Sequence, residues 1–264
     1  MLSSHQEQFH LKITSGQIGR YCILPGDPGR CEKIAAYLEA PRQISQNREY
    51  NIFTGTLDGV PVTVCSTGIG GPSTAIAVEE LVNCGADTLI RVGTCGGISL
   101  HVRAGDVVIA SGAVRQDGTS REYAPSEFPA VSDPDVLFAL RESARAAGFR
   151  AHTGIVQSKD AFYGQHNPEQ LPTCGELLAK WEAWKRLGVL ASEMEASTLY
   201  TVAAYRGVRA GAVFHTIWNQ ELAGVDPENG QKEDPDTDRA IRTAIGAIRI
   251  LIREDRKKEN ENHA

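Results

Sequence analysis

The stretch CSTGIGGPSTAIAVEEL, residues 65–81, decides the fold of this 264-residue chain. It joins the end of an apolar run, Val60 to Ser66, to a glycine-rich turn and then to a helical pattern. Pro72 suits the first turn of a helix, where its missing N–H costs no hydrogen bond. Apolar residues then recur at helical spacing until Gly85, which ends the helix. This order of strand, glycine turn and helix is typical of α/β proteins.

The rest of the chain repeats the same alternation, and so predicts an α/β fold with helices packed on a sheet. Asp58 and Gly59 separate two strand-like runs, Tyr50 to Leu57 and Val60 to Ser66, which predicts a hairpin and therefore a mixed sheet. Two further helices are expected, one from near Glu193 to before Gly207 and one from about Asp236 to Arg253. The other expected strands are Tyr21 to Leu24, Thr88 to Val92, Asp106 to Ala110, Gly154 to Gln157 and Ala212 to Ile217.

Length and composition favour one large domain without a linker, residues 1–264, with flexible tails at 1–8 and 255–264. No apolar stretch is long enough to cross a bilayer, and MLSSHQEQFH lacks the basic start and apolar core of a secretory signal. We therefore expect a cytoplasmic protein. A formal net charge of −6 provides no basic surface for a nucleic acid. The cysteines form no C-x-x-C pair, which favours reduced, structural thiols at Cys22, Cys31, Cys65, Cys84, Cys95 and Cys174.

Two arginines suggest an anion site. Arg91 lies within an apolar strand-like run, and a guanidinium is rarely buried without an anionic partner. That partner is either an internal carboxylate such as Asp87 or Glu80, or a bound oxyanion. Arg30 ends a second glycine-rich turn that follows a strand. The planar guanidinium groups of Arg30 and Arg91 can therefore bind one tetrahedral anion together. Spacing alone favours phosphate. The three glycine-rich turns expected after strands are PGDPGR at 25–30, TGIGGPS at 67–73 and GTCGG at 93–97.

These turns do not match the motifs of larger phosphorylated ligands. GTCGG departs from the dinucleotide fingerprint, and TGIGGPS has Ser73 where the last glycine should stand. No Walker-type lysine follows either run. A nicotinamide cofactor and a nucleoside triphosphate are therefore poorly supported. In the segment ASEMEAS, Glu193 and Glu195 can be explained simply as acids that complement a helix N-terminus.

Taken together, PGDPGR, CSTGIGGPSTAIAVEEL, RVGTCGG at 91–97 and SEMEAS at 192–197 resemble the uridine phosphorylase branch of the nucleoside phosphorylase family. FHL at 9–11, NREY at 47–50 and DAFYGQ at 160–165 extend the resemblance over most of the chain from about residue 9 to 220. It implies a mixed, partly closed, barrel-like sheet flanked by helices. It also implies a homo-oligomer, a dimer at least and commonly a hexamer.

The resemblance implies which residues bind phosphate and sugar. Phosphate, the co-substrate, would be bound by Gly26, Arg30, Arg91 and Thr94, with Arg48 from a neighbouring subunit. Ribose would be bound by Thr94, Met194 and Glu195, with His10 from the neighbour. From the sequence alone, His10 would otherwise be a mobile N-terminal residue. No organic cofactor is implied, and in some relatives a potassium ion occupies positions that match Glu49, Ile69 and Ser73.

The base would lie against residues of two loops, namely Phe162, Gln165, His166, Ile217 and Trp218. Plain core packing is the competing interpretation of Phe162. Many family members carry Gln-x-Arg in the uracil loop, whereas here His166 and Asn167 follow Gln165, so the arginine is missing. The residue that replaces it stays open among His166, a water and another loop residue.

The implied reaction is phosphorolysis, in which phosphate attacks a sugar that becomes cation-like, as in glycoside cleavage. Arg91 would place the phosphate, Glu195 would hold the ribose, and Gln165 with a protonated His166 would stabilise the leaving uracil. Purine-specific relatives place an aspartate after the strand that here ends in Ile217, whereas this chain has Asn219 and Gln220. This favours a pyrimidine. The alternatives are a purine nucleoside phosphorylase, a nucleosidase of the same fold and a nucleoside-binding protein without turnover.

Overall fold

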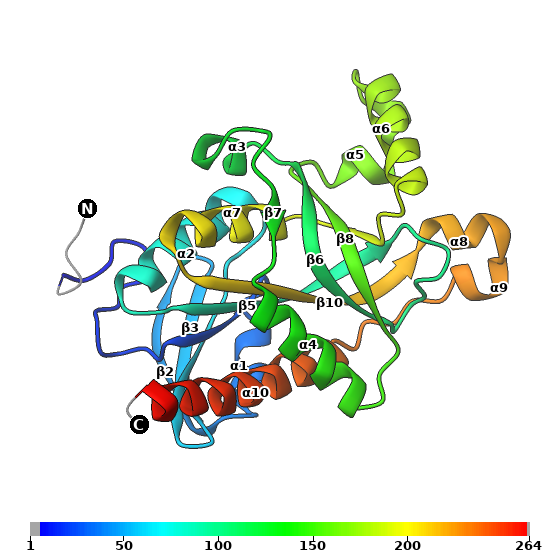
Figure 1. Ribbon diagram of the computed structural model, residues 1–264. Helices are drawn as coiled ribbons and strands as arrows, with labels where there is room; N and C mark the ends of the chain where they lie inside the picture. Colours follow the sequence, from blue (N-terminus) through cyan, green and yellow to red (C-terminus); the bar gives the residue numbers. More distant parts are fainter. Residues whose placement is uncertain (1–5, 263–264) are drawn as a thin grey trace.

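Ten strands within residues 6–262 form one continuous sheet, and five of them close into a barrel (Figure 1). The computed structural model describes residues 6–262, apart from the side chains of Asn229 and Asn262. Strands β10, β6, β8, β9 and β5 form the closed ring, because β5 pairs with both β9 and β10. Strands β1, β4, β3 and β2 extend the sheet outward from β5. The strands are β1 Tyr21–Pro25, β2 Glu39–Asn47, β3 Tyr50–Leu57, β4 Val60–Cys65, β5 Thr88–Gly97, β6 Val107–Gln116, β7 Ala130–Val131, β8 Ala151–Lys159, β9 Ala191–Glu193 and β10 Arg209–Asn219.

The sheet divides along β5. The first half of β5, from Thr88 to Val92, pairs with β1 on one side, whereas Gly96 and Gly97 pair with β9 on that side. Strand β10 accompanies β5 along the other side throughout. Between the two partners, no strand of the described residues 6–262 pairs with residues 93–95 on the dividing side. Such a division opens a crevice at the ends of parallel strands, the usual ligand site of α/β folds.

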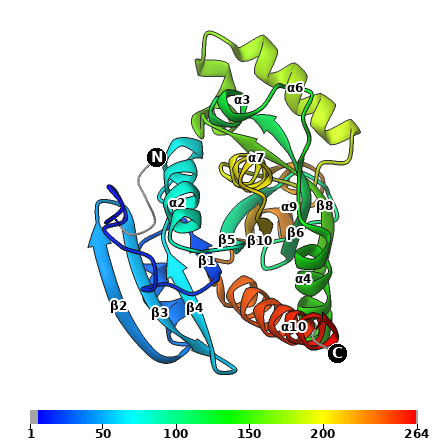
Figure 2. The same cartoon turned by 60° about the vertical axis from the view of Figure 1, so that its left-hand side comes forward.

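Helices cover both sides of the sheet (Figure 2). Helices α2 and α7 pack on one core with Cys22 and Leu24 of β1, whereas α4 and α10 pack on the other with Tyr21 and Ile23. The alternation along β1 is the two-residue period of a strand that is buried on both faces. The helices are α1 Arg30–Ala35, α2 Gly71–Asn83, α3 Thr119–Tyr123, α4 Pro134–Ala146, α5 Tyr163–His166, the 3-10 turn η1 Pro168–Gln170, α6 Cys174–Arg186, α7 Ala196–Arg206, α8 Gln220–Val225, α9 Pro227–Gly230 and α10 Asp238–Asn262.

The mixed α/β sheet and the hairpin are confirmed. Strand β3 has the predicted bounds, and Asp58 and Gly59 both have positive φ, as the favoured two-residue turn requires. Each of the other predicted strands except β4 is longer than expected, because pairing continues beyond the apolar run that predicted it. None of the helices in residues 6–262 is long and apolar enough to cross a membrane. All six cysteines are free thiols.

Four expectations were wrong. Residues 93–97 are not a turn but the second half of β5. Helix α7 begins at Ala196, because residues 191–193 pair with β5 and β8 as β9. Helix α10 begins at Asp238 and continues to Asn262, where a disordered tail was expected from residue 255. Asp255 stabilises this last part, because it bonds Tyr21 and Arg209 of the sheet. Gln8 is buried, so the expected N-terminal tail ends before it, and residues 1–5 lie outside the described residues.

Gly211 allows helix α4 to lie against β10. A methyl group at this position would meet a side-chain carbon of Val136 at 2.4 Å and one of Leu140 at 3.1 Å. We expect Gly211→Ala to lower the free energy of unfolding by about 1–3 kcal/mol, as overpacking of a core does. Gly175→Ala in helix α6 is the control, since nothing lies within 4 Å of its added methyl. Urea unfolding would contradict the packing argument if both variants had the wild-type midpoint.

Candidate active site

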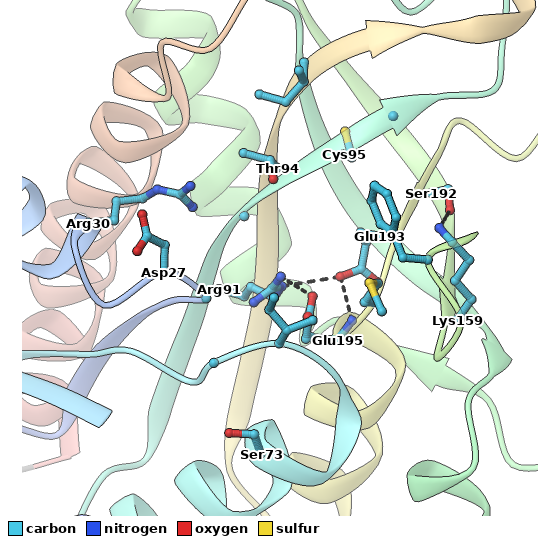
Figure 3. Close-up of a pocket in the computed structure, with 18 of the residues that line it drawn as sticks. Asp27, Arg30, Ser73, Arg91, Thr94, Cys95, Lys159, Ser192, Glu193 and Glu195 are labelled. Carbon is cyan, nitrogen blue, oxygen red and sulfur yellow. Dashed lines mark hydrogen bonds and ion pairs between the residues drawn. The ribbon is translucent and has the colours of Figure 1, made fainter. Parts of the chain in front are cut away.

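A cavity of about 780 Å³ opens where β5 changes partners (Figure 3). Its wall comes from β5, from the ends of β8, β9 and β10, from the turns and helix starts that follow β1 and β4, from the turn after β2, and from residues 162–166. Every residue assigned above to phosphate, ribose, base or cation lines this cavity, except His10 and Arg48, which were expected from a neighbouring subunit. Topology therefore brings together segments from residue 26 to residue 218. Figure 3 shows Arg30 and Asp27 at one end, Lys159 and Ser192 at the other, and Glu193 and Glu195 between them, with Arg91 on the side of the glutamates toward Arg30.

The guanidinium groups of Arg30 and Arg91 and the backbone at Gly26, which has no side chain, form one end of the cavity. Burial lowers the pKa of Arg30, and the nearby positive charge of Arg91 lowers it further, although Asp27 acts in the opposite direction. Arg30 donates one bond to the Val92 carbonyl, at 3.3 Å. A methyl at Gly26 would lie 3.8 Å from Nη1 of Arg91, so this glycine leaves the guanidinium open to the cavity. A buried guanidinium and a half-buried one beside a glycine turn are a site for a small anion.

Arg91 is held from one side by two buried glutamates. Its Nη2 donates to Glu195 in a short contact, and its Nε lies 3.3 Å from Oε2 of Glu193. Only 4% of Arg91 is exposed, and its Nη1 has no hydrogen-bond partner among residues 6–262. A buried donor without a partner is costly, so an acceptor is expected there. The internal carboxylates suggested by the sequence, Asp87 and Glu80, instead pair with Arg20 and His10.

The two glutamates lie at the start of helix α7. Glu195 is the residue before the helix, and its Oε1 accepts a bond from the backbone N–H of Gly70 at 2.7 Å. Glu193 accepts bonds from the N–H groups of Glu195 and Ala196 at 2.9 and 3.0 Å. Burial raises the pKa of Glu193, against the lowering effect of Arg91. Glu193 therefore caps the helix and orients Arg91, whereas Glu195 and Met194 line the middle of the cavity.

At the opposite end, a buried lysine faces the cavity. Lys159, the last residue of β8, is 7% exposed and donates to Oε1 of Gln165 at 2.6 Å and to the Ser192 hydroxyl. Burial lowers its pKa to about 8, although Glu193 and Glu195 favour its charged form. Because Lys159 occupies the amide oxygen of Gln165, Nε2 of Gln165 is left without a partner among the described residues. This end offers an ammonium and an amide N–H.

Aromatic rings form the wall beside these donors. The ring of His166 lies 4.3 Å from that of Phe162 and stacks on Trp218 at 5.3 Å. A methyl at Gly96 would lie 3.6 Å from Nε2 of Gln165 and from Nε1 of Trp218, so glycine brings the strand close to both. Phe162 is 51% exposed, which excludes the core-packing interpretation. Burial and the charge of Lys159 lower the pKa of His166, which disfavours the protonated form of its ring.

Glu49 and Ser73 meet at the edge of the cavity. The Ser73 hydroxyl bonds Glu49 at 2.7 Å and Tyr50 at 3.1 Å, and Ile69 beside them is 78% exposed. Carboxylate and hydroxyl oxygens suit a hard cation in type. Residues 6–262 contain no group of three or more His, Cys, Asp or Glu side chains that could hold a metal ion.

The two residues expected from a neighbour lie outside the cavity of their own chain. Arg48 is exposed at the two-residue turn between β2 and β3, with a φ of 54° that is rare outside glycine. His10 bonds Glu80 through its ring at 2.7 Å and through its backbone N–H. Glu80 also accepts the N–H of Leu11 at 2.7 Å. The loop that carries His10 is thereby fixed on helix α2.

The sequence argument missed Lys159 and misread Asn219. Lys159 could have been found by the reasoning used for Arg91, since it is a cation that follows an apolar strand. Asn219 does not face the cavity, because its amide caps helix α8 and donates to the carbonyls of Ser99 and Val102. The cavity-lining residues Phe162, Gln165, His166, Ile217 and Trp218, which were expected to contact the base, include no acid.

Residues 20–253 match the model of a protein family described as the phosphorylase superfamily. A uridine phosphorylase of Treponema pallidum is 50% identical over 94% of this chain and 95% of its own length. A uridine phosphorylase of Escherichia coli is 40% identical over 96% of this chain and 99% of its own. A guanosine phosphorylase of Halorubrum lacusprofundi is 38% identical over 93% of this chain and 99% of its own length.

The lowered pKa of Lys159 predicts a pH-dependent stability. In the unfolded chain its pKa is about 10.4, so between pH 8 and 10 the unfolded state binds more protons and stability rises with pH. Relative to Lys159→Met, the wild-type free energy of unfolding should rise by about 2 kcal/mol from pH 7.5 to 9.5. Urea titrations at both pH values measure this. Lys258→Met is the control, because Asp135 raises the pKa of that lysine. Parallel pH dependence in wild type and Lys159→Met would contradict the assignment.

Proposed function

The chain belongs to the phosphorylase superfamily, and on this premise we propose that it cleaves uridine with inorganic phosphate to uracil and ribose 1-phosphate. The protein is thus an enzyme, a pentosyltransferase of pyrimidine nucleoside salvage. One observation carries the proposal: a single cavity has two guanidinium groups at one end, an ammonium and a free amide N–H at the other, and acids between. That order matches the order of phosphate, sugar and base in the reacting complex.

At the phosphate end, Arg30 and Arg91 would hold the anion against the backbone at Gly26, with Thr94 beside it on β5. Nη1 of Arg91 is the donor that still needs an acceptor. Phosphate is already an anion, so its attack on C1′ requires no base. Positioning therefore supplies much of the rate, because two reactants held in line react as one molecule. A neighbouring subunit would add Arg48.

In the middle, Glu195 and Met194 would hold the ribose, with His10 from the neighbouring subunit. The bond from C1′ to N1 of the base breaks as the bond from phosphate oxygen to C1′ forms, and the electron pair of the broken bond leaves with the base. The sugar carries positive charge in the transition state. Glu193 and Glu195, both buried beside C1′ in this arrangement, favour that charge electrostatically.

At the base end, the leaving uracil becomes an anion whose charge lies on its carbonyl oxygens. Lys159 and Nε2 of Gln165 would stabilise it, and Phe162, His166, Ile217 and Trp218 would wall the ring. The Lys159 ammonium also supplies the positive charge that the arginine of the Gln-x-Arg pattern provides in relatives. No acid is needed, because the uracil anion is an acceptable leaving group.

The proposal includes an assembly and a location. Since Arg48 and His10 lie outside their own cavity, a complete site needs a second subunit, and a hexamer would contain three such pairs. Glu49 and Ser73, with the chain at Ile69, would hold a potassium ion at that subunit contact, and no organic cofactor takes part. The enzyme would work in the cytoplasm on uridine, and on deoxyuridine or thymidine.

Two related activities are the main alternatives. The guanosine phosphorylase of Halorubrum lacusprofundi is 38% identical, so a purine substrate is the first of them. A nucleosidase of the same fold, with water in place of phosphate, is the second. The Lys159 ammonium at the base end favours uracil over a purine, because a purine leaves most readily once protonated.

Four assays decide between these reactions: uridine and inosine, each with and without phosphate. We expect loss of uridine absorbance only when phosphate is present, with formation of ribose 1-phosphate and little turnover of inosine. Cleavage of uridine without phosphate would instead identify a nucleosidase. Preference for inosine would identify a purine enzyme, and binding without product would identify a binding protein.

Two substitutions should separate the ends of the cavity. Arg30→Ala should raise the KM for phosphate by about tenfold to a hundredfold, the size of a lost hydrogen bond to a charged group, with the KM for uridine nearly unchanged. Gln165→Ala should lower kcat/KM for uridine by about tenfold to a hundredfold and leave the KM for phosphate unchanged. Steady-state kinetics with each substrate varied in turn measures both. The same pattern in both variants would refute the assignment of ends.

A further inference from the structure

A buried carboxylate outside the cavity contacts the helix that carries Glu195. Asp117 follows the last residue of β6 and is 2% exposed. It accepts bonds from the N–H and the hydroxyl of Ser120, at 2.7 and 2.8 Å. It also accepts the hydroxyls of Ser197 and Thr198, the second at 2.9 Å. Among residues 6–262 it forms no ion pair with lysine, arginine or histidine.

An isolated buried carboxylate is costly unless donors surround it. Burial raises the pKa of Asp117, but the bonds from Ser197, Ser120 and Thr198 outweigh this effect, so its pKa lies below the usual value. The group is therefore an anion whose neighbours are three hydroxyls and one N–H. An alanine and a valine in place of Ser197 and Thr198 would fill the same space, so packing alone does not explain this arrangement.

The position of Ser197 and Thr198 explains it better. They are the second and third residues of helix α7, and Glu195 is the residue immediately before the helix. Glu195 has no side-chain bond to the first turn, because its carboxylate is turned to Gly70 and Arg91. The first turn is instead held from outside. Glu193 of β9 accepts hydrogen bonds from the backbone N–H groups of Glu195 and Ala196. The Ser158 hydroxyl of β8 accepts a hydrogen bond from the backbone N–H of Ser197.

Asp117 supplies the third attachment, from β6. Together the three attach the start of α7 to β9, to β8 and to the residue that follows β6. Asp117 also ties this point to α3 through Ser120, whose hydroxyl accepts a bond from Arg115 at 3.0 Å. The start of α2 is equally close, since a methyl at Gly71 would lie 2.7 Å from the hydroxyls of Thr119 and Thr198. Glu195 thus lies at the junction of α2, α3 and α7.

We propose that Asp117 is a positioning residue of the phosphorolysis reaction: through Ser197 and Thr198 it sets the place of helix α7, and so of Glu195 against the ribose. The inference rests on the proposed function for the role of Glu195, and the placement itself rests only on the contacts above. A shift of one ångström in a group that holds substrate costs up to about a hundredfold in rate.

Asp117→Asn tests the proposal with little change of volume. The amide of asparagine can still contact the neighbouring hydroxyls, because a hydroxyl can rotate and accept a hydrogen bond from the amide nitrogen. The amide has only one acceptor oxygen, however, and cannot accept as many hydrogen bonds as a carboxylate. We expect kcat/KM for uridine to fall about tenfold, with the KM for phosphate within twofold of wild type. Asp255→Asn is the matched control, a buried acid that bonds Tyr21 and Arg209 on the far side of the sheet. It should lower the unfolding midpoint but leave kcat/KM within twofold.

A double-mutant cycle separates positioning from general stability. If Asp117 acts through Glu195, Asp117→Asn should lower kcat/KM less than twofold when added to Glu195→Gln, because the contact that it positions is already gone. The proposal would be overturned if the loss of kcat/KM in the double variant equalled the product of the losses in Asp117→Asn and Glu195→Gln. Ser197→Ala offers a second route if Asp117→Asn does not fold, with a threefold to tenfold loss expected. An unchanged kcat/KM in Ser197→Ala would also overturn it.

A measurement without substrate distinguishes this proposal from the proposed function. Hydrogen exchange at the backbone amides of residues 195–197 should be at least tenfold faster in Asp117→Asn than in wild type, and unchanged in Asp255→Asn. Faster exchange in a protein that does not cleave uridine would refute the proposed function and keep the positioning role. Unchanged exchange at these amides would refute the positioning role whatever the substrate.

Discussion

The contact of Arg91 with Glu193 and Glu195 is the interaction on which the rest of the structure depends. A guanidinium and two carboxylates are buried where β5 leaves β1 and joins β9. Each charge would be costly alone, and removing one partner of such a group usually costs about 3–5 kcal/mol. The contact therefore ties the strand that carries Arg91 to the short β9 and to the start of α7. It also leaves Nη1 of Arg91 without a hydrogen-bond partner in the part of the chain that the structure describes, so the same residues that close the barrel prepare an anion site.

The cavity follows from the division of the sheet. Because β5 pairs with β10 along its whole length but changes its other partner, a gap must open beside residues 93–95. Glycine is needed there for packing: a methyl at Gly93 would meet the Phe214 ring at 2.8 Å. The small residues that resembled a turn are thus the residues that let a long strand pass between a buried ring and the cavity. Strand continuity also fixes the two ends of the cavity relative to each other.

Charge varies along the cavity in the order that phosphorolysis requires. Cations lie where an anion would attack, carboxylates where the sugar becomes positive, and a lysine where the base leaves as an anion. In the proposed reaction Lys159 would stabilise the leaving base, because it donates to Gln165 and lines this end of the cavity; burial lowers its pKa to about 8. The aromatic wall of Phe162, His166 and Trp218 supplies shape rather than charge, as the lowered pKa of His166 indicates.

The sequence by itself determined the α/β alternation, the hairpin at Asp58, the helix after Gly71 and the buried state of Arg91, because these follow from local periodicity, turn chemistry and the cost of burying charge. Motif order added the residues that line the cavity. Only the tertiary structure decided which acids meet Arg91, that residues 93–97 are a strand, that helix α10 continues to Asn262, and that Lys159 belongs to the site. These depend on partners distant in sequence: Glu193 is 102 residues from Arg91, and no local pattern encodes which strand will lie beside it.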